Sequence, residues 1–127
     1  MENAELDHTK RFSNATVETC RTLNWSGIDT LAQELRQLRE RQGRLFVLGL
    51  GGSAGNASHM VNDLRKLTDL ESYTPTDNVS ELTARINDDG WGNAFVGWLQ
   101  VSRLSSSDAV FVLSVGGGDS KKGVSQE

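Results

Sequence analysis

The stretch Leu45-Phe46-Val47-Leu48-Gly49-Leu50-Gly51-Gly52-Ser53-Ala54 decides the fold class. Its apolar run, which is bounded by glycines, predicts a parallel strand buried on both faces. The glycines and serine predict a turn into a helix, whose apolar face would run through positions 57, 60, 61, 64 and 67. A strand, a glycine turn and a helix in this order predict an α/β domain. Such a turn gathers bare backbone N–H groups at a helix N-terminus, which suits an anion such as phosphate.

Three interpretations of this glycine turn stay open. An anion site is favoured, in which Gly51, Gly52 and Ser53 would bind a phosphate. The turn also fits the alanine-ended form of the dinucleotide fingerprint, for which Asp69 or Glu71 would supply the distant acidic group. No convincing strand ends near those two residues, so this second interpretation is weaker. The third is a turn that serves only the close packing of strand on helix.

A second buried strand is expected over 109–113, followed by the turn Ser114-Val115-Gly116-Gly117-Gly118-Asp119-Ser120. The turn is either a second anion cradle or a loop in which Asp119 caps a helix that begins near Lys121. Asp119 would place a negative charge where a phosphate would lie. Since the sequence stops at Glu127, we expect an incomplete α/β core that lacks a helix and further strands.

The segment before the first strand is expected to be helical over 3–23 and 27–41. Ser26 would cap the second helix and Gly43 would end it. The two helices would wrap the sheet or pair with those of another subunit. We therefore treat 1–127 as one domain, with a helical pair over 1–43 and an α/β core over 44–127.

The region between the two strands is less clearly patterned. A short strand is expected near Tyr73, and residues 81–86 fit either a helical turn or a strand. Residues 87–90 are expected to form a turn that can cap the next helix, whose apolar residues are Trp91, Phe95, Trp98 and Leu99.

Composition narrows the class of function. The net charge of −4 and the lack of a basic run argue against a nucleic-acid surface. Cys20 is the only cysteine, so an intrachain disulfide is excluded and a cytoplasmic setting is the default. The N-terminus does not resemble a signal peptide, and no apolar run approaches the roughly 18 residues of a membrane span.

His59 and Asp63 lie four residues apart, more than 90° from the apolar stripe of their helix, by the ~100° that each residue turns. A histidine and an aspartate at this spacing can share a metal ion or a proton. A solvated surface pair is the more common case, and two ligands are too few for a metal site.

These motifs together resemble the sugar isomerase (SIS) family, most closely its phosphoheptose isomerase branch. The resemblance rests on Gly49–Ala54, on His59 with an acidic residue four later, and on Leu82-Thr83-Ala84-Arg85-Ile86-Asn87-Asp88. Two helices before the first strand fit as well. The resemblance implies a parallel-sheet, SIS-type sandwich that forms homo-oligomers, dimers or tetramers, with sites between subunits. The implied reaction is an aldose–ketose isomerisation of a phosphorylated sugar, from sedoheptulose 7-phosphate to a heptose 7-phosphate.

The resemblance also implies residue roles. Ser53 and Ser114 would hold the phosphate, and Asn87 and Asp88 would lie at the sugar. His59 would be a zinc ligand, and Asp63 would be both the catalytic base and a zinc ligand. Where the family has a serine- and threonine-rich second turn, this chain has Val115, three glycines and Asp119. Leu50 replaces an asparagine, Asp63 replaces a glutamate, and the family's remaining catalytic histidine and glutamine lie beyond this sequence.

The leading hypothesis is therefore a phosphoheptose isomerase-like enzyme. A non-catalytic module that binds a phosphosugar is the alternative, and a nucleotide-binding fragment is a third, weaker one.

Overall fold

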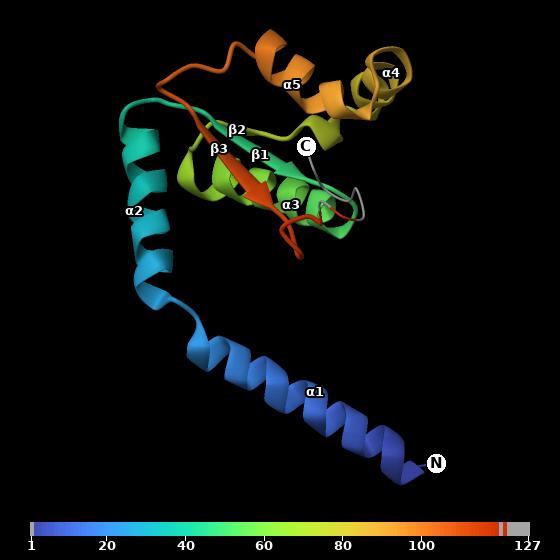
Figure 1. The fold of residues 1–127 in the computed structure, drawn as a ribbon. Helices are drawn as coiled ribbons and strands as arrows, with labels where there is room; N and C mark the ends of the chain where they lie inside the picture. Colours follow the sequence, from blue (N-terminus) through green and yellow to red (C-terminus); the bar gives the residue numbers. More distant parts are fainter. Residues whose placement is uncertain (1, 120, 122–127) are drawn as a thin grey trace. The chain divides into compact units, whose positions relative to one another are not determined.

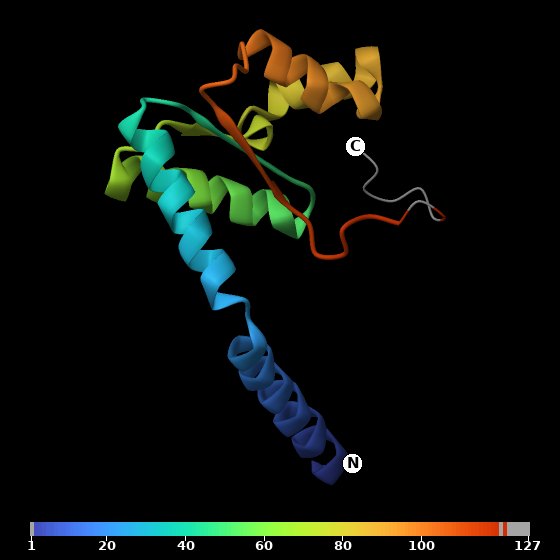
Figure 2. The same cartoon turned by 60° about the vertical axis from the view of Figure 1, so that its left-hand side comes forward.

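The computed structural model describes residues 2–119 and 121, and it is a mixed α/β structure (Figures 1 and 2). The chain divides into two compact units, residues 1–34 and 35–127, with the boundary inside the second helix. The elements in order are α1 (Glu2–Thr22), α2 (Trp25–Glu40), β1 (Leu45–Gly49), α3 (Gly52–Thr68), β2 (Ser72–Tyr73), the 3-10 turn η1 (Pro75–Asp77), α4 (Val79–Asp89), α5 (Trp91–Val101) and β3 (Ala109–Leu113).

The N-terminal unit contains α1 and the first part of α2. Asn24 precedes α2 and caps it, because its side-chain oxygen accepts hydrogen bonds from the Gly27 N–H at 3.0 Å and the Ser26 hydroxyl at 2.9 Å. The expectation that Ser26 is the cap was therefore wrong: α2 begins at Trp25, so Ser26 already lies inside the first turn.

The end of α2 lies close to the loop that precedes β3. Gln42 adopts a left-handed φ of 58°, and the Gly43 N–H donates to the Leu38 carbonyl at 2.9 Å, as in a Schellman motif. Gly43 follows the left-handed residue. A Cβ at Gly43 would overlap the Ser107 carbonyl oxygen and stand 2.5 Å from Leu38 Cδ1. Glycine is required here for close packing, whereas the sequence suggested a simple helix stop.

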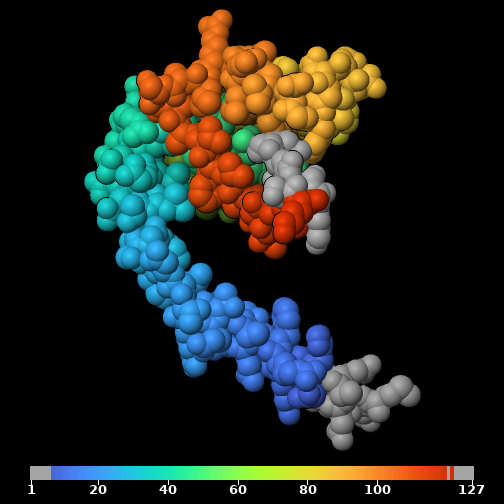
Figure 3. Space-filling view, viewed as in Figure 1, coloured from blue at the N-terminus to red at the C-terminus, as the bar shows by residue number. Residues whose placement is uncertain are grey.

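The sheet has the order β2-β1-β3, and both pairings are parallel. Leu45 is in register with Ser72 on one side and with Ala109 on the other. The central strand β1 is almost entirely buried, as expected. The strand β3 was expected to be buried too, but Val110 and Val112 are 41% and 63% exposed. Within the described residues β3 is an edge strand, and Figure 3 shows this orange-red segment at the surface.

One face of the sheet packs against α3 and the end of α2. The buried cluster on this face consists of Leu38, Leu45, Val47, Ala57, Val61 and Leu70. Leu67 was expected on the apolar face of α3, yet it is 71% exposed. The helix ends at Thr68 and the chain then reverses at Asp69, which has a φ of 56°. This reversal brings Leu70 into the core in place of Leu67.

The other face of the sheet packs against α5, so the sheet lies between α3 and α5 (Figures 1 and 2). Phe46 of β1 lies edge-on to Trp98 of α5, with ring centroids 5.6 Å apart, and it stacks on Tyr73 of β2 at 6.1 Å. These aromatic contacts fix α5 over the sheet.

The segment between β2 and β3 is more helical than its sequence suggested. Residues 81–86 belong to α4, which Asn78 caps by accepting the Glu81 N–H at 3.2 Å. The prediction of a turn over 87–90 was wrong for its first three residues, because Asn87, Asp88 and Asp89 form the last turn of α4. Only Gly90, with a φ of 80°, separates α4 from α5.

An ion pair joins the start of β1 to the loop before β3. The Asp108 side chain is 2% exposed and accepts hydrogen bonds from the Arg44 guanidinium at 2.8 and 3.1 Å and from the Arg44 backbone N–H at 3.0 Å. The guanidinium holds the pKa of Asp108 well below its usual range. The pair fixes the register at which β1 and β3 begin.

Each helix in the described ranges is too short or too polar to pass through a lipid bilayer. The helix expected to begin near Lys121 falls mostly on residues outside those ranges.

Candidate functional site

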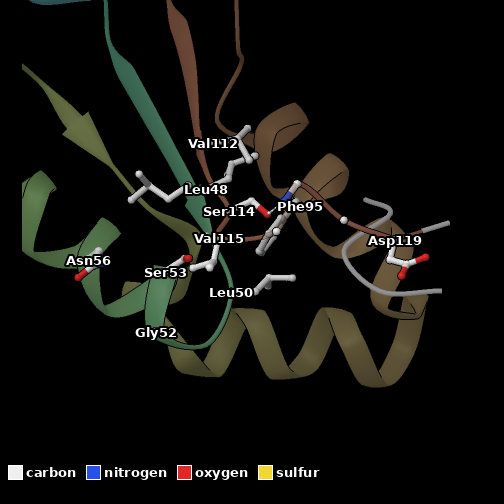
Figure 4. Close-up of a pocket in the computed structure, with 15 residues that line it drawn as sticks. Leu48, Leu50, Gly52, Ser53, Asn56, Phe95, Val112, Ser114, Val115 and Asp119 are labelled. Atoms are coloured by element: carbon white, nitrogen blue, oxygen red, sulfur yellow. Dashed lines mark hydrogen bonds between the residues drawn. The ribbon is translucent and has the colours of Figure 1, made fainter. Parts of the chain in front are cut away.

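A cavity of about 1100 Å³ lies at the carboxyl ends of β1 and β3 (Figure 4). The chain leaves β1 through α3 to reach β2 on one side, and it returns through α4 and α5 to β3 on the other side. The carboxyl ends of β1 and β3 therefore diverge at a topological switch point, where ligands of open α/β sheets bind. The lining residues are 48–50, 52, 53, 56, 95 and 112–119.

Glycine occupies positions 49, 51 and 52 of the first turn for different structural reasons. A Cβ on Gly49 would stand 2.5 Å from the Ser53 carbonyl oxygen, so Gly49 allows β1 to approach the first turn of α3. Gly51 has a φ of 56° and a ψ of −122°, a conformation that is essentially restricted to glycine. Gly52 has no positive φ, and a Cβ there would meet nothing within 4 Å. The fold explains Gly49 and Gly51, whereas Gly52 keeps the cavity wall open.

The start of α3 presents polar groups that lack partners. The Ser53 side chain is part of a residue that is only 8% exposed, and it lines the cavity. Among the described residues, neither the Ser53 hydroxyl nor the Gly52 N–H makes a hydrogen bond. Both groups are donors at the positive end of a helix dipole. This is the arrangement that holds an anion in a site without cationic side chains.

The second glycine turn forms the opposite wall of the cavity. The Ser114 hydroxyl oxygen accepts the Gly117 N–H at 3.0 Å, and Gly117 and Gly118 both have positive φ, 64° and 84°. Asp119 accepts the Lys121 N–H at 2.9 Å, which is the bond that an N-cap makes to the second helical residue. Ser114 and Asp119 both line the cavity, as the sequence suggested, although the helix that Asp119 would cap falls on residues outside the described ranges.

Two lining residues, Asn56 and Phe95, lie outside the strand ends and glycine turns that the sequence singled out. Asn56 lies on α3, one turn after Ser53, and Phe95 projects from α5 (Figure 4). Phe95 was assigned to the apolar face of its helix, and its ring lies 5.9 Å from that of Trp91. Asn56 could have been found from its spacing, since positions 52, 56, 59 and 63 follow one helical face.

His59 and Asp63 continue this face away from the cavity. Their side chains are 79% and 46% exposed, and His59 Nε2 lies 3.4 Å from Asp63 Oδ2. Neither residue lines the cavity. Within the described ranges, no group of three histidine, cysteine or acidic side chains comes together as a metal site would require. The pair supplies donors that suit zinc, but only two of the usual ligands.

The remaining predicted residues lie outside the cavity wall. Gly51 shapes the turn but is not among the lining residues, and neither are Asn87 and Asp88, which are exposed at the end of α4. The dinucleotide interpretation requires Asp69 or Glu71 as its acidic group, but both residues precede β2, which ends at Tyr73. An acidic residue at the carboxyl end of that strand is what ribose recognition requires.

Comparison with solved structures identifies a protein of the same fold. The chain is similar to phosphoheptose isomerase GmhA from Neisseria gonorrhoeae, with a TM-score of 0.73 and 23% sequence identity over 89% of this chain. The match covers 60% of that protein, so this chain spans less than two thirds of its length. No protein-family model and no curated protein matches the sequence. At this identity the likeness establishes the fold, which is the α/β fold of a phosphoheptose isomerase.

Proposed function

We propose that the cavity at the carboxyl ends of β1 and β3 binds a phosphorylated sugar. The observation that carries this proposal is the Ser53 hydroxyl, which belongs to a residue only 8% exposed and opens onto the cavity without a hydrogen-bond partner in the described part of the chain. A phosphate oxygen in the cavity would accept the proton of this hydroxyl. The Gly52 N–H and the N-terminus of α3 would bind the same anion. The shared fold with a phosphoheptose isomerase supports this choice of ligand.

The proposed reaction is an aldose–ketose isomerisation. A base removes a proton from the carbon next to the carbonyl, the C–H electron pair forms the C=C bond of an enediol, and the carbonyl oxygen is protonated. Asp63 is the proposed base and His59 its neighbour, with Asn87 and Asp88 proposed at the sugar. If zinc binds, His59 and Asp63 would be two of its ligands, and it would polarise the carbonyl.

A second candidate function is binding of a phosphosugar without catalysis. The observation that favours it is the position of His59 and Asp63, which do not line the cavity and whose side chains are 79% and 46% exposed. A catalytic base must come within hydrogen-bond reach of the proton that it removes. In this case the chain would sense or carry a sugar phosphate, and isomerase activity would be absent while binding persists.

We also propose that the chain self-associates through its N-terminal helices. Large apolar side chains of the N-terminal unit are exposed, among them Phe12 at 69% and Trp25 at 58%. A helix of this kind is stabilised mainly by packing, so exposed apolar residues along it indicate a partner helix.

The test is binding of sedoheptulose 7-phosphate by calorimetry, followed by an isomerase assay with and without added zinc. Ser53→Ala should weaken binding about tenfold, as expected for the loss of one charge-assisted hydrogen bond. Ser58→Ala, on the same helix but outside the cavity wall, is the control and should bind normally. Unchanged affinity in Ser53→Ala would remove the first turn from the site. Binding without turnover would favour the second candidate.

A further inference from the structure

A second cavity, of about 350 Å³, lies beside β2, which is an edge strand of the described sheet. Its wall is built from α3, β2, η1, α4 and α5, and no residue of this wall also lines the cavity at the carboxyl ends of β1 and β3. Its volume is at the small end of the ~300–1,000 Å³ that is usual for small-molecule sites. The second cavity therefore suits a small metabolite.

Arg65 of α3 brings a positive charge to this cavity. Its guanidinium carbon lies 5.1 Å from the centre of the Tyr73 ring, and Nη1 donates to the Ser72 carbonyl oxygen at 3.1 Å. The ring contact and this hydrogen bond hold the guanidinium at the edge of β2. A guanidinium has five N–H donors, and in the described part of the chain this one makes no other hydrogen bond and no ion pair. Its remaining donors can bind a carboxylate.

Asp77 brings a negative charge to the same cavity. One oxygen of its carboxylate accepts the hydroxyl proton of Ser58, and within the described ranges the carboxylate has no counter-ion and no further hydrogen bond. The other acidic lining residue, Glu81, differs because Arg85 binds one of its oxygens at 2.7 and 2.9 Å. The cavity thus has one cation and one anion that pair neither with each other nor with another described side chain.

We propose that this second cavity binds a free α-amino acid with an apolar side chain. The Arg65 guanidinium binds the two carboxylate oxygens of the amino acid, and the second oxygen of Asp77 accepts a proton of its ammonium group. Apolar surface for the side chain comes from Trp98, which is half-buried, and from Val61. A zwitterion of this kind compensates both unpaired charges at once, which a phosphate or a simple cation cannot do.

The first experiment measures calorimetric binding of L-leucine and of two analogues that each lack one charge. Isocaproate has the carbon chain and carboxylate of leucine without the ammonium group, and isoamylamine has the ammonium group without the carboxylate. We expect the wild-type chain to bind each analogue at least about tenfold more weakly than L-leucine, as for the loss of one charge-assisted hydrogen bond. An analogue that binds as well as L-leucine would overturn the recognition of a zwitterion.

Two variants test the two charged residues. Asp77→Asn removes the negative charge and keeps an oxygen for the Ser58 hydroxyl, and Arg65→Gln removes the positive charge. The controls Asp89→Asn and Lys66→Gln make the same changes of charge at exposed positions that do not line the cavity. We expect Asp77→Asn and Arg65→Gln to bind L-leucine about tenfold more weakly than the wild type, and both controls to bind it normally. Because isocaproate lacks the ammonium group, Asp77→Asn should not weaken its binding.

The remaining outcomes also decide the proposal. No binding of L-leucine by the wild type up to millimolar concentration would overturn it, and so would normal binding of L-leucine by Asp77→Asn. If Arg65→Gln fails to fold, the analogues and Asp77→Asn still give the answer. Since the two cavities have no lining residue in common, Asp77→Asn should bind sedoheptulose 7-phosphate as the wild type does, so failure here leaves the phosphosugar proposal intact.

Discussion

Arg44 and Asp108, which are 64 residues apart in sequence, form the most buried ion pair in the described part of the chain. The carboxylate of Asp108 also accepts the Ser105 backbone N–H at 2.9 Å. The pair therefore ties together the two segments whose strands form the walls of the candidate site.

Asp108→Asn should destabilise the fold by about 2–3 kcal/mol at pH 7, because it leaves the Arg44 guanidinium without its counter-ion. The loss should depend on pH. The folded-state pKa of Asp108 is below its unfolded value, so the stabilisation is fully present above the unfolded pKa near 4 and is lost as pH falls toward the folded pKa. Urea denaturation at pH 7 and pH 3 measures this: the difference between wild type and Asp108→Asn should shrink in acid. If wild type and Asp108→Asn differed in free energy of unfolding by the same amount at pH 7 and at pH 3, the stabilising role of the Arg44–Asp108 pair would be contradicted.

Gly49→Ala and Gly52→Ala should separate stability from binding. The new methyl group at position 49 would press on backbone atoms of Ser53, so we expect a loss of about 1–3 kcal/mol in the free energy of unfolding. At position 52 the methyl group has open space, and alanine favours the helix by up to about 1 kcal/mol. That methyl group stands in the cavity wall, so Gly52→Ala should instead weaken binding of sedoheptulose 7-phosphate. Normal binding by a stable Gly52→Ala protein would contradict the role given to this position.

His59→Ala should lower zinc affinity on the order of tenfold or more, since it removes one of only two adjacent donors. Zinc content after dialysis, measured by mass spectrometry, gives the stoichiometry for each chain. The control is His8→Ala, because His8 is the only other histidine and lies on α1. Retention of zinc by His59→Ala, or equal loss in both variants, would show that the His59–Asp63 pair is not a metal site.

Phe12→Glu should lower the mass of the assembly if α1 mediates self-association. A charge in an apolar helix interface costs several kcal/mol, whereas Lys10→Glu on the same helix changes a polar position and should leave the assembly intact. Light scattering after size-exclusion chromatography measures both. A monomeric wild-type protein would contradict the proposal directly.

The fold was predictable where its signals are local. The run from Leu45 through Ser53 contains the strand, the turn and the helix start within ten residues, and the structure has all three. The errors arose where distant contacts decide. Leu67 follows the helical period but is exposed, because the chain reversal at Asp69 sends Leu70 to the core. Ser26 lies within α2, since Asn24 two residues earlier makes the better cap.

The candidate site was predictable only in part, and for a related reason. Ser53, Ser114 and Asp119 belong to glycine-rich turns, which mark strand ends in the sequence itself. Phe95 reaches the cavity only because α5 is held over β1 by the contact between Phe46 and Trp98. No local sequence pattern predicts that contact. The helical spacing of Phe95 therefore assigned its side chain to the core, although it also lines the cavity.

The pairing of β1 with β3 has a consequence for the order of folding. The unit β1–α3–β2 can form from contacts within about thirty residues, whereas β3 must close a loop about twice as long before it joins. The cavity has only one wall until that step occurs. A ligand that bridges both walls binds only after β3 has joined the sheet, so it should slow unfolding and leave the refolding rate nearly unchanged.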